Sequence, residues 1–343
     1  MIGGGIIGLA TAWRLAQRKL QVAVWERGQI GTEASWAGAG MLAPGGEMEE
    51  RSWWGDLALR SLKQYAEFVR ELESESDLRI DYRACGALES AATDDRWERL
   101  RQRAGRQAGW GIESQHAGSR CLFYPQDAAV DPRDLLRALA VACRRRGVTI
   151  REYQTVTCIV GSNNTGSSIT GGITEPELAE VAVLAAGAWS SSIPIHIDGS
   201  VVPVDASFPV RGHLISFAAS TGVLPGPIVR QDHTYILQRS NGTVIAGSTT
   251  EQVGFLREPD PRQFADIEQR ARTLDPRLCG GVLVDTWIGF RPGTVSGEPR
   301  LGRLASSPVY LAYGHYRNGI LLAPATAGLL ADAITASSQT DLT

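Results

Sequence analysis

The chain opens with Met1-Ile-Gly-Gly-Gly-Ile-Ile-Gly8, whose glycines form the pattern G-x-G-x-x-G. Residues 6–18 then follow the period of an amphipathic helix. An apolar run at residues 21–25 predicts a buried strand, and Glu26 follows it, 18 residues after Gly8. In dinucleotide-binding folds, an acidic residue about 20 positions beyond such a loop binds a ribose hydroxyl. This order of loop, helix, strand and acid therefore predicts a dinucleotide-binding unit.

Each glycine of the loop has a physical role in such a unit. Gly3 allows a tight turn, Gly5 lets the backbone approach a pyrophosphate, and Gly8 permits close packing of the helix on the strand. The pyrophosphate would meet free N–H groups and the positive end of the helix dipole. The alternative is a glycine-rich turn without a ligand, and the helix, strand and acid that follow make it the weaker interpretation.

The strand that should precede this loop is short in the sequence. A dinucleotide-binding fold has a strand of about five residues there, at the centre of a parallel sheet. Only Met1 and Ile2 precede Gly3. The sequence favours a start codon assigned too far downstream over a chain that folds with such a stub. If the protein is made in this form, we expect weaker central pairing, lower stability and a weaker cofactor site.

The composition is that of a globular protein without a nucleic-acid partner. Of the 343 residues, 43% are hydrophobic and 21% are charged, which allows a sizeable core and excludes wholesale disorder. The formal net charge of −3 gives no basic excess that would attract a phosphate backbone. The chain has 38 glycines among 343 residues, a larger fraction than the usual share of about 7%, which indicates tight turns and close backbone approaches.

We expect no metal site, disulfide or membrane span. The five cysteines are far apart and never form CxxC, a distribution typical of buried thiols in a cytoplasmic protein. The five histidines match no metal-ligand spacing, so surface or hydrogen-bonding roles are expected for them. The longest uninterrupted apolar run, at residues 181–189, is far shorter than the roughly 18 residues of a spanning helix, and no signal peptide is recognisable.

The rest of the chain alternates two kinds of pattern. Helical periodicity covers residues 52–73, 94–107, 131–146, 264–274 and 319–336. Apolar strand patterns cover residues 148–150, 154–160, 181–187, 282–290 and 308–313, with a polar hairpin tip at 162–172. Two short strands are expected within 79–90, and residues 201–247 alternate as an antiparallel sheet does. This distribution indicates a dinucleotide-binding domain interrupted by a second domain.

Three further segments carry a family pattern: SWAGAGMLAP at 35–44, WIGFRPGT at 287–294 and GHYRNGILLAPAT at 314–326. With VLAAGAW at 183–189, they make the chain resemble the FAD-dependent D-amino-acid oxidase superfamily over nearly its whole length, and its glycine oxidases most of all. The resemblance implies an α/β fold with a Rossmann-like FAD-binding domain of the glutathione-reductase type. An α+β substrate domain with a large antiparallel sheet would interrupt it. The first domain would comprise residues 1–50, 131–203 and 286–343, and the second residues 51–130 and 204–285.

The same resemblance implies FAD, bound without a covalent link. Some relatives attach their flavin to a cysteine near the C-terminus, but the last cysteine here, Cys279, lies outside the matching motif. Small residues at 37–40 would let the backbone approach the flavin ring, and a helix N-terminus after 314–319 suits the negative charge of a reduced flavin. The cofactor-binding residues expected on this basis are Gly3, Gly5, Ile6, Ile7, Gly8, Glu26, Arg27, Ala34, Ser35, Ala39, Gly40, Met41, Val156, Gly187, Trp189, His315, Tyr316, Arg317, Asn318, Gly319, Ile320 and Leu321.

Three residues are expected at the substrate. The resemblance implies that Arg291 binds the carboxylate of an amino acid, a role that suits a planar guanidinium. It also implies that the Tyr235 hydroxyl helps hold the same carboxylate and that Arg317 lies beside the substrate. The alternatives are a solvated arginine, a half-buried strand tyrosine and a salt-bridged loop arginine. Where glycine oxidases have a methionine, this chain has AGSTT at 246–250, so a pocket near Thr250 is expected to be more polar and to admit a larger amino acid.

The implied reaction is oxidation of glycine or another small amino acid or amine, such as sarcosine or a D-amino acid. A hydride passes from Cα to the flavin, the imine hydrolyses to an oxo acid and ammonia, and molecular oxygen is reduced to hydrogen peroxide. The resemblance further implies a role in making the thiazole of thiamine, a cytoplasmic location and a homo-oligomer. Two alternatives stay open: a dehydrogenase of the same fold with an acceptor other than oxygen, and a truncated relative that does not hold FAD.

Overall fold

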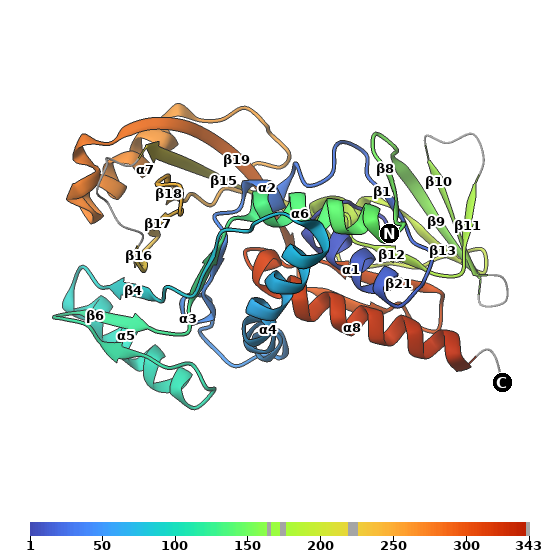
Figure 1. Cartoon of the computed structure of the whole chain (residues 1–343), viewed down its shortest axis with the longest axis horizontal. Helices are drawn as coiled ribbons and strands as arrows, with labels where there is room; N and C mark the ends of the chain where they lie inside the picture. The colour runs from blue at the N-terminus through green and yellow to red at the C-terminus, as the bar shows by residue number, and fades with distance from the viewer. Residues whose placement is uncertain (163–165, 172–175, 219–225, 341–343) are drawn as a thin grey trace.

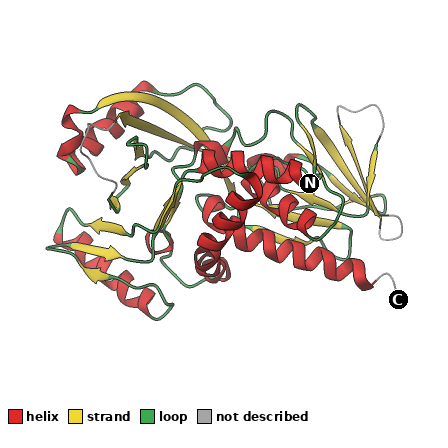
Figure 2. Cartoon of the chain, in the orientation of Figure 1, coloured by secondary structure: helices red, strands yellow, loops and turns green. Residues whose placement is uncertain are grey.

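The computed structural model describes the whole chain except residues 163–165, 172–175, 219–225 and 341–343. Figure 1 shows an elongated molecule with a lobe of strands at each end and helices between them. One lobe carries α7, β4–β6 and β15–β19, and the other carries β8–β11 and β13. Figure 2 shows how the long helices gather in the middle of the molecule.

A mostly parallel sheet forms the base of the first unit. Its strands are β8 (Thr149–Arg151), β1 (Ala23–Trp25), β12 (Ala182–Leu184), β21 (Val309–Tyr313) and β20 (Arg300–Arg303). β1 pairs in parallel with β8 and β12 with β21, while β20 runs antiparallel at the edge. Ile2 forms parallel bridges to both Trp25 and Leu184 and so occupies the central position between the two pairs. The Met1 amino group donates to the carbonyl oxygen of Ala23 (2.7 Å).

Four helices pack on this sheet and share its core. They are α1 (Ile6–Gln17), α4 (Trp53–Ser76), α6 (Pro132–Arg145) and α8 (Gly319–Thr340). The rings of Trp13 on α1 and Phe68 on α4 meet edge to face with centroids 5.4 Å apart. The Tyr65 hydroxyl donates to the carbonyl oxygen of Ile320 (3.1 Å). Helix α4, which the expected division assigns to the second domain, therefore packs with the helices of the first.

Helix α8 differs from the expectation that no segment is long and apolar enough to cross a membrane. Among the described residues, Gly319–Ala336 passes that test, with a mean hydropathy of 1.5. Of this window, 61% is buried inside the protein, against α1, α4 and the parallel sheet. A long apolar helix of this kind is also what a large α/β core requires.

An eight-stranded mixed sheet forms the second unit. In spatial order it comprises β19 (Val282–Thr294), β15 (Ser207–Ala218), β18 (Val244–Gly247), β17 (Thr234–Gln238), β16 (Ile228–Gln231), β4 (Ala87–Ser90), β6 (Cys121–Tyr124) and β5 (Gln115–His116). All neighbours are antiparallel except β16 and β4. Helix α7 (Pro261–Leu274) buries Ile267 and Ala271 against β15 and β18, and α5 (Asp94–Ala108) buries Leu100 and Ala104.

Smaller elements complete the chain. A five-stranded sheet has the order β11 (Glu177–Ala179), β10 (Gly166–Gly171), β9 (Val156–Ser162), β13 (Ile195–Ile197) and β14 (Ser200–Val201). A three-stranded sheet joins β2 (Met41–Leu42), β7 (Ala128–Val130) and β3 (Tyr82–Arg83). The short helices are α2 (Ala34–Ala37), α3 (Pro44–Glu47), η1 (Gly187–Ser192) and η2 (Pro276–Gly280).

Two local expectations were wrong. The segment 162–172 is not mainly a hairpin tip, because β10 pairs with β9 over Gly166–Gly171; positions 163–165 and 172 lie outside the described residues. Its small polar residues alternate on a strand whose Ser167 and Ile169 are buried. The strand expected at 21–25 is shorter, since only Ala23–Trp25 pairs with β8.

Candidate active site

A cavity of about 800 Å³ lies where the two units meet. Its walls include the loop after Ile2, the ends of β1, β12 and β21, the α2–β2 segment and residues of β17 and β19. Of the residues predicted from the sequence, those that line it are Gly3, Gly5, Ile6, Ile7, Glu26, Arg27, Ala34, Ser35, Ala39, Gly40, Met41, Val156, Gly187, Trp189, Tyr235, Arg291, His315, Tyr316, Arg317, Asn318, Gly319 and Ile320. Two are not on its wall: Gly8 packs beneath the loop, and Leu321 belongs to the hydrophobic core.

The glycine loop is closed tightly over the parallel sheet. Gly3 has a φ of +109°, and a Cβ there would overlap the carbonyl oxygen of Ala185. A Cβ on Gly8 would overlap the carbonyl oxygen of Gly3. Gly5 is the N-cap of α1 and carries no side chain into the cavity, while the Ile6 N–H donates to Ser35 Oγ (2.9 Å). The positive end of the α1 dipole therefore opens onto the cavity, where it favours an anion.

Glu26 lies beside this loop with a fixed carboxylate. Its Oε2 accepts from the Gly4 N–H and its Oε1 from the Gly28 N–H, both at 2.9 Å. Next to it, the Arg27 guanidinium lies over the Trp189 ring, 3.6 Å from the centroid. A carboxylate with this fixed orientation at the end of a parallel strand matches the ribose acceptor of dinucleotide-binding folds.

A second helix N-terminus opens onto the same cavity. Asn318, Gly319 and Ile320 begin α8 and line the wall. His315 just before them is fully buried, and burial lowers its pKa to about 3, so its ring is neutral at physiological pH. Opposite, Gly40 has a φ of +79°, and a Cβ there would overlap the carbonyl oxygen of Val130.

These features fit a flavin dinucleotide. The loop and the α1 N-terminus suit the pyrophosphate, and Glu26 suits a ribose. The N-terminus of α8, which lines the same cavity as Gly40, suits a flat ring whose reduced form carries negative charge. The exposed Cys279 is not among the residues that line the cavity.

Arg291 on β19 is a half-buried cation that lines this cavity. Its Nη1 donates to the carbonyl oxygen of Thr249 and its Nη2 to Ser248 Oγ, both at 2.9 Å. Among the described residues, no carboxylate forms an ion pair with it. Burial lowers the pKa of Arg291, and the nearby Tyr235 raises it in part. A guanidinium with two donors fixed on neutral oxygens and no counter-ion is suited to an anionic ligand.

Tyr235 on β17 lies beside Arg291. Its hydroxyl is hydrogen-bonded to Ser248, the residue to which Arg291 also donates. Gly247 is its partner across the β17–β18 pair, and a Cβ there would come within 2.5 Å of the Tyr235 hydroxyl. Burial raises the pKa of Tyr235, so the hydroxyl keeps its proton and can donate to a carboxylate.

Arg317 also lines the cavity, with a different set of partners. Its Nη2 donates to Thr250 Oγ1 (3.1 Å), and its Nη1 lies 3.8 Å from Glu47 Oε1. Thr250 itself is not on the cavity wall; the lining residue of that segment is Ser248. The polar side chain that this segment adds to the cavity is therefore Ser248, while Thr250 accepts a hydrogen bond from Arg317.

Sequence reasoning missed several lining residues, of which Glu47 is the most informative. It ends α3 and is half-buried, and desolvation raises its pKa against the opposing effects of Arg317 and Arg230. The signal available in the sequence was an acid directly after the Gly45-Gly46 pair. Arg230 was missed too; it pairs with Glu89 (2.7 Å) and Asp127 (2.8 Å) in the cavity wall.

The histidines contribute no metal site within the described residues, where no group of three His, Cys, Asp or Glu side chains could hold an ion. His233 is exposed and lines the cavity, whereas His213 is fully buried and both of its ring nitrogens form hydrogen bonds.

Comparison with known proteins gives consistent matches over the whole chain. The DAO family, described as FAD dependent oxidoreductase, matches residues 1–333. A bifunctional protein ThiO/ThiG of Synechocystis is 36% identical over 97% of this chain and 51% of its own length, so the chain spans about half of that relative. The glycine oxidase of Bacillus licheniformis is 31% identical over 97% of this chain and 92% of its own. The crystal structure of glycine oxidase from Geobacillus kaustophilus superposes with a TM-score of 0.90 at 28% identity, covering 98% and 93% of the two chains.

Proposed function

The chain belongs to the DAO family of FAD-dependent oxidoreductases, and on this premise we propose that it is an amino-acid oxidase. The substrate is glycine or another small amino acid or amine, such as sarcosine or a D-amino acid. The products are an imine, which water converts to an oxo acid and ammonia, and hydrogen peroxide from molecular oxygen. Curated relatives with the names glycine oxidase and ThiO/ThiG support this choice of substrate class.

The observation that carries the proposal is the half-buried guanidinium of Arg291, without an ion-pair partner among the described residues, in the cavity that the glycine loop also lines. Two of its donors are used by Thr249 and Ser248, and the remaining N–H groups are available to a substrate carboxylate. The protonated hydroxyl of Tyr235 is the second donor to that carboxylate. A carboxylate held at two points fixes the direction of the Cα hydrogen, and such positioning supplies much of the rate.

The cofactor is FAD, and this chain has the residues to hold it. Gly3, Gly5 and the α1 N-terminus would bind the pyrophosphate, Glu26 a ribose, and the 39–41 segment with the α8 N-terminus the flavin ring. When bound, FAD supplies a hydride acceptor next to the substrate. We propose that binding is non-covalent, because Cys279 is not among the lining residues.

The protein's own side chains then orient the substrate and set the charge around it. Arg291 and Tyr235 orient the carboxylate, and Arg317 and Glu47 line the same cavity. The neutral ring of His315 adds no charge near the α8 N-terminus, where the helix dipole and the Arg317 guanidinium supply positive potential. No side-chain base is required if the amine arrives neutral, so the roles assigned here are positioning and electrostatic.

The cellular context is proposed at the same level. The ThiO/ThiG relatives suggest that the product serves thiamine thiazole synthesis in the cytoplasm. We propose the two-domain division expected from the sequence, with α4 assigned to the FAD-binding domain on account of its packing, and assembly into a homo-oligomer.

The test is an anaerobic titration of the purified yellow protein with glycine, followed by admission of air. Bleaching of the visible flavin band by glycine and release of peroxide in air are the expected results. A yellow protein that neither glycine, sarcosine nor small D-amino acids bleach would contradict the proposal. Bleaching without peroxide would favour a dehydrogenase with another electron acceptor.

A further inference from the structure

One short segment behind the cavity holds both substrate-side arginines. It comprises residues 248–251, which follow β18. Ser248 Oγ and the Thr249 carbonyl oxygen each accept from Arg291 at 2.9 Å, and Thr250 Oγ1 accepts from Arg317 at 3.1 Å. The orientation of both guanidinium groups therefore depends on where the 248–251 segment lies.

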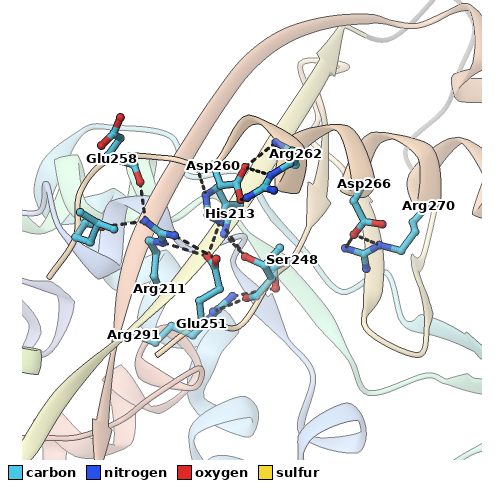
Figure 3. Close-up of polar contacts among 12 residues, drawn as sticks. Arg211, His213, Ser248, Glu251, Glu258, Asp260, Arg262, Asp266, Arg270 and Arg291 are labelled. Carbon is cyan, nitrogen blue, oxygen red and sulfur yellow. Dashed lines mark hydrogen bonds and ion pairs between the residues drawn. The ribbon is translucent and has the colours of Figure 1, made fainter. Parts of the chain in front are cut away.

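Glu251 at the end of this segment is fixed to β15 by its backbone and its side chain. Backbone bonds run between Arg211 and Glu251 in both directions, at 2.9 and 3.0 Å. The Arg211 guanidinium donates to both carboxylate oxygens of Glu251, each at 3.1 Å. Arg211 is buried and also donates to the carbonyl oxygens of Leu256 (3.2 Å) and Glu258 (2.6 Å). Figure 3 shows the Arg211 guanidinium between the Glu251 carboxylate and the loop that leads to α7.

His213, two residues further along β15, closes the network. Its Nδ1 lies 3.0 Å from Glu251 Oε2 and 2.9 Å from Thr249 Oγ1, and its backbone N–H donates to the same hydroxyl (3.0 Å). Its Nε2 accepts from the backbone N–H of Asp260 (3.1 Å). Because a backbone N–H can only donate, Nε2 is unprotonated and the ring proton is on Nδ1, facing Glu251 and Thr249.

We propose that Arg211, His213 and Glu251 are positioning residues for the substrate carboxylate. They do not line the cavity, but they fix the position of the 248–251 segment, and this segment in turn orients the guanidinium groups of Arg291 and Arg317. The inference rests on the proposed function, because it takes these two arginines as the carboxylate side of the site. A purely structural role is the competing explanation, and it predicts a different pattern of effects.

The test compares Glu251→Gln, His213→Leu and His213→Asn with wild-type holoenzyme. Acetate is the probe, and its dissociation constant is read from the change it causes in the flavin spectrum of the oxidised protein; KM and kcat for glycine are measured in parallel. We expect Glu251→Gln and His213→Leu to weaken acetate binding and raise KM about tenfold or more, with a smaller change in kcat. His213→Asn, which keeps a donor towards Glu251, recovers most of the loss. FAD content stays as in wild type.

A matched control is available on α7. Asp266 and Arg270 form an ion pair (2.9 Å) on α7 (Figure 3), and neither side chain forms a hydrogen bond or ion pair with the described residues 248–251. Asp266→Asn should leave acetate binding and KM unchanged. Should His213→Leu fail to fold, Glu251→Gln and the near-isosteric Thr249→Val, which removes only the hydroxyl facing His213, carry the test.

The outcomes separate the two proposals. Variants that bind acetate as tightly as wild type, or that lose thermal stability without a change in the acetate constant or KM, overturn the positioning role alone. A wild-type protein that binds acetate but is reduced by none of the amino acids overturns the proposed function and leaves the network's role in anion binding measurable.

Discussion

Arg291 illustrates how a single half-buried cation specifies a ligand. Removing a guanidinium from water is costly unless its donors are satisfied and its charge is balanced. Here two donors reach the Thr249 carbonyl and the Ser248 hydroxyl, which satisfy hydrogen bonds but do not balance the charge. A carboxylate entering the cavity supplies the missing charge, so part of the cost of burial is recovered when substrate binds.

Replacing Arg291 by Lys tests this role directly. The ammonium keeps the charge but cannot donate to Ser248, Thr249 and a carboxylate in one plane. We expect KM for glycine and the acetate dissociation constant to rise about 100-fold, with FAD content unchanged. Arg277→Lys, at an exposed ion pair with Asp275, is the control and should behave as wild type. Unchanged acetate affinity in Arg291→Lys would mean that the carboxylate binds elsewhere.

Glu47 gives the site a pH dependence whose sign follows from its position. Burial raises its pKa, with Arg317 as the largest opposing influence, and the ionised carboxylate 3.8 Å from Arg317 competes with any anionic ligand. As the pH falls from 8 towards about 5, Glu47 takes up a proton before an ordinary glutamate would, and anion binding strengthens. Trifluoroacetate, which stays ionised throughout, is the appropriate probe.

The variant Glu47→Gln should bind trifluoroacetate about tenfold more tightly than wild type at pH 8, with a flatter pH profile. His315, with a pKa lowered to about 3 by burial, and Tyr235, whose pKa burial raises, do not titrate in this window. The difference between the two profiles therefore isolates Glu47. If trifluoroacetate affinity changed with pH by the same amount in both proteins, Glu47 would not be the group that controls anion binding.

At the scale of elements, the glycine loop shows why local patterns are predictive. The position of Gly8 follows from a close backbone contact within one βα turn, because a Cβ there would overlap the carbonyl oxygen of Gly3. A Cβ on Gly3 would overlap the carbonyl oxygen of Ala185, at the end of the neighbouring strand. Gly8→Ala should therefore separate α1 from the loop, lower the thermal midpoint and reduce the flavin-to-protein ratio by at least half. The ratio of visible to ultraviolet absorbance measures the second effect.

Gly105 on α5 is the matched control for this substitution. A Cβ there would meet nothing within 4 Å, and Gly in a helix interior costs about 0.5–1 kcal/mol relative to Ala. Gly105→Ala should therefore leave flavin content unchanged and stabilise the protein by that amount. Full FAD retention in Gly8→Ala would show that the loop relaxes without loss of the site.

The elements predicted from the sequence are those with local signals. Ser52 and Asp131 accept hydrogen bonds from Gly55 and Arg133 as N-caps of α4 and α6, and both helices begin within one residue of the expected position. The predicted cofactor residues, apart from Gly8 and Leu321, line one cavity. The contacts that the sequence did not reveal join distant segments: Glu251 with Arg211, forty residues apart, and Glu47 with Arg317. No periodicity or spacing rule encodes such pairs.

At the scale of the molecule, the cavity is formed by contacts that hold the two units together. Phe255, from the loop before α7, stacks on Trp189 of η1 with ring centroids 4.5 Å apart. Arg257 of the same loop pairs with Glu33 of the first unit (2.6 Å). Since Arg211 also fixes the carbonyls of this loop, the residues that position the substrate side are tied to those that close the cofactor side.

Whether α8 is a core helix or a membrane-spanning helix can be tested at two adjacent leucines, which differ sharply in burial. Leu330 is 2% exposed and packs in the core with α1 and α4, whereas Leu329 is 38% exposed. For a core helix, Leu330→Asp should cost at least about 3 kcal/mol and abolish flavin retention, and Leu329→Asp should cost less than about 1 kcal/mol. Thermal midpoints and yields without detergent measure both effects. A helix surrounded by lipid would be disturbed by either charge, and its protein would need detergent, so equal damage from the two substitutions would contradict the packing described for α8.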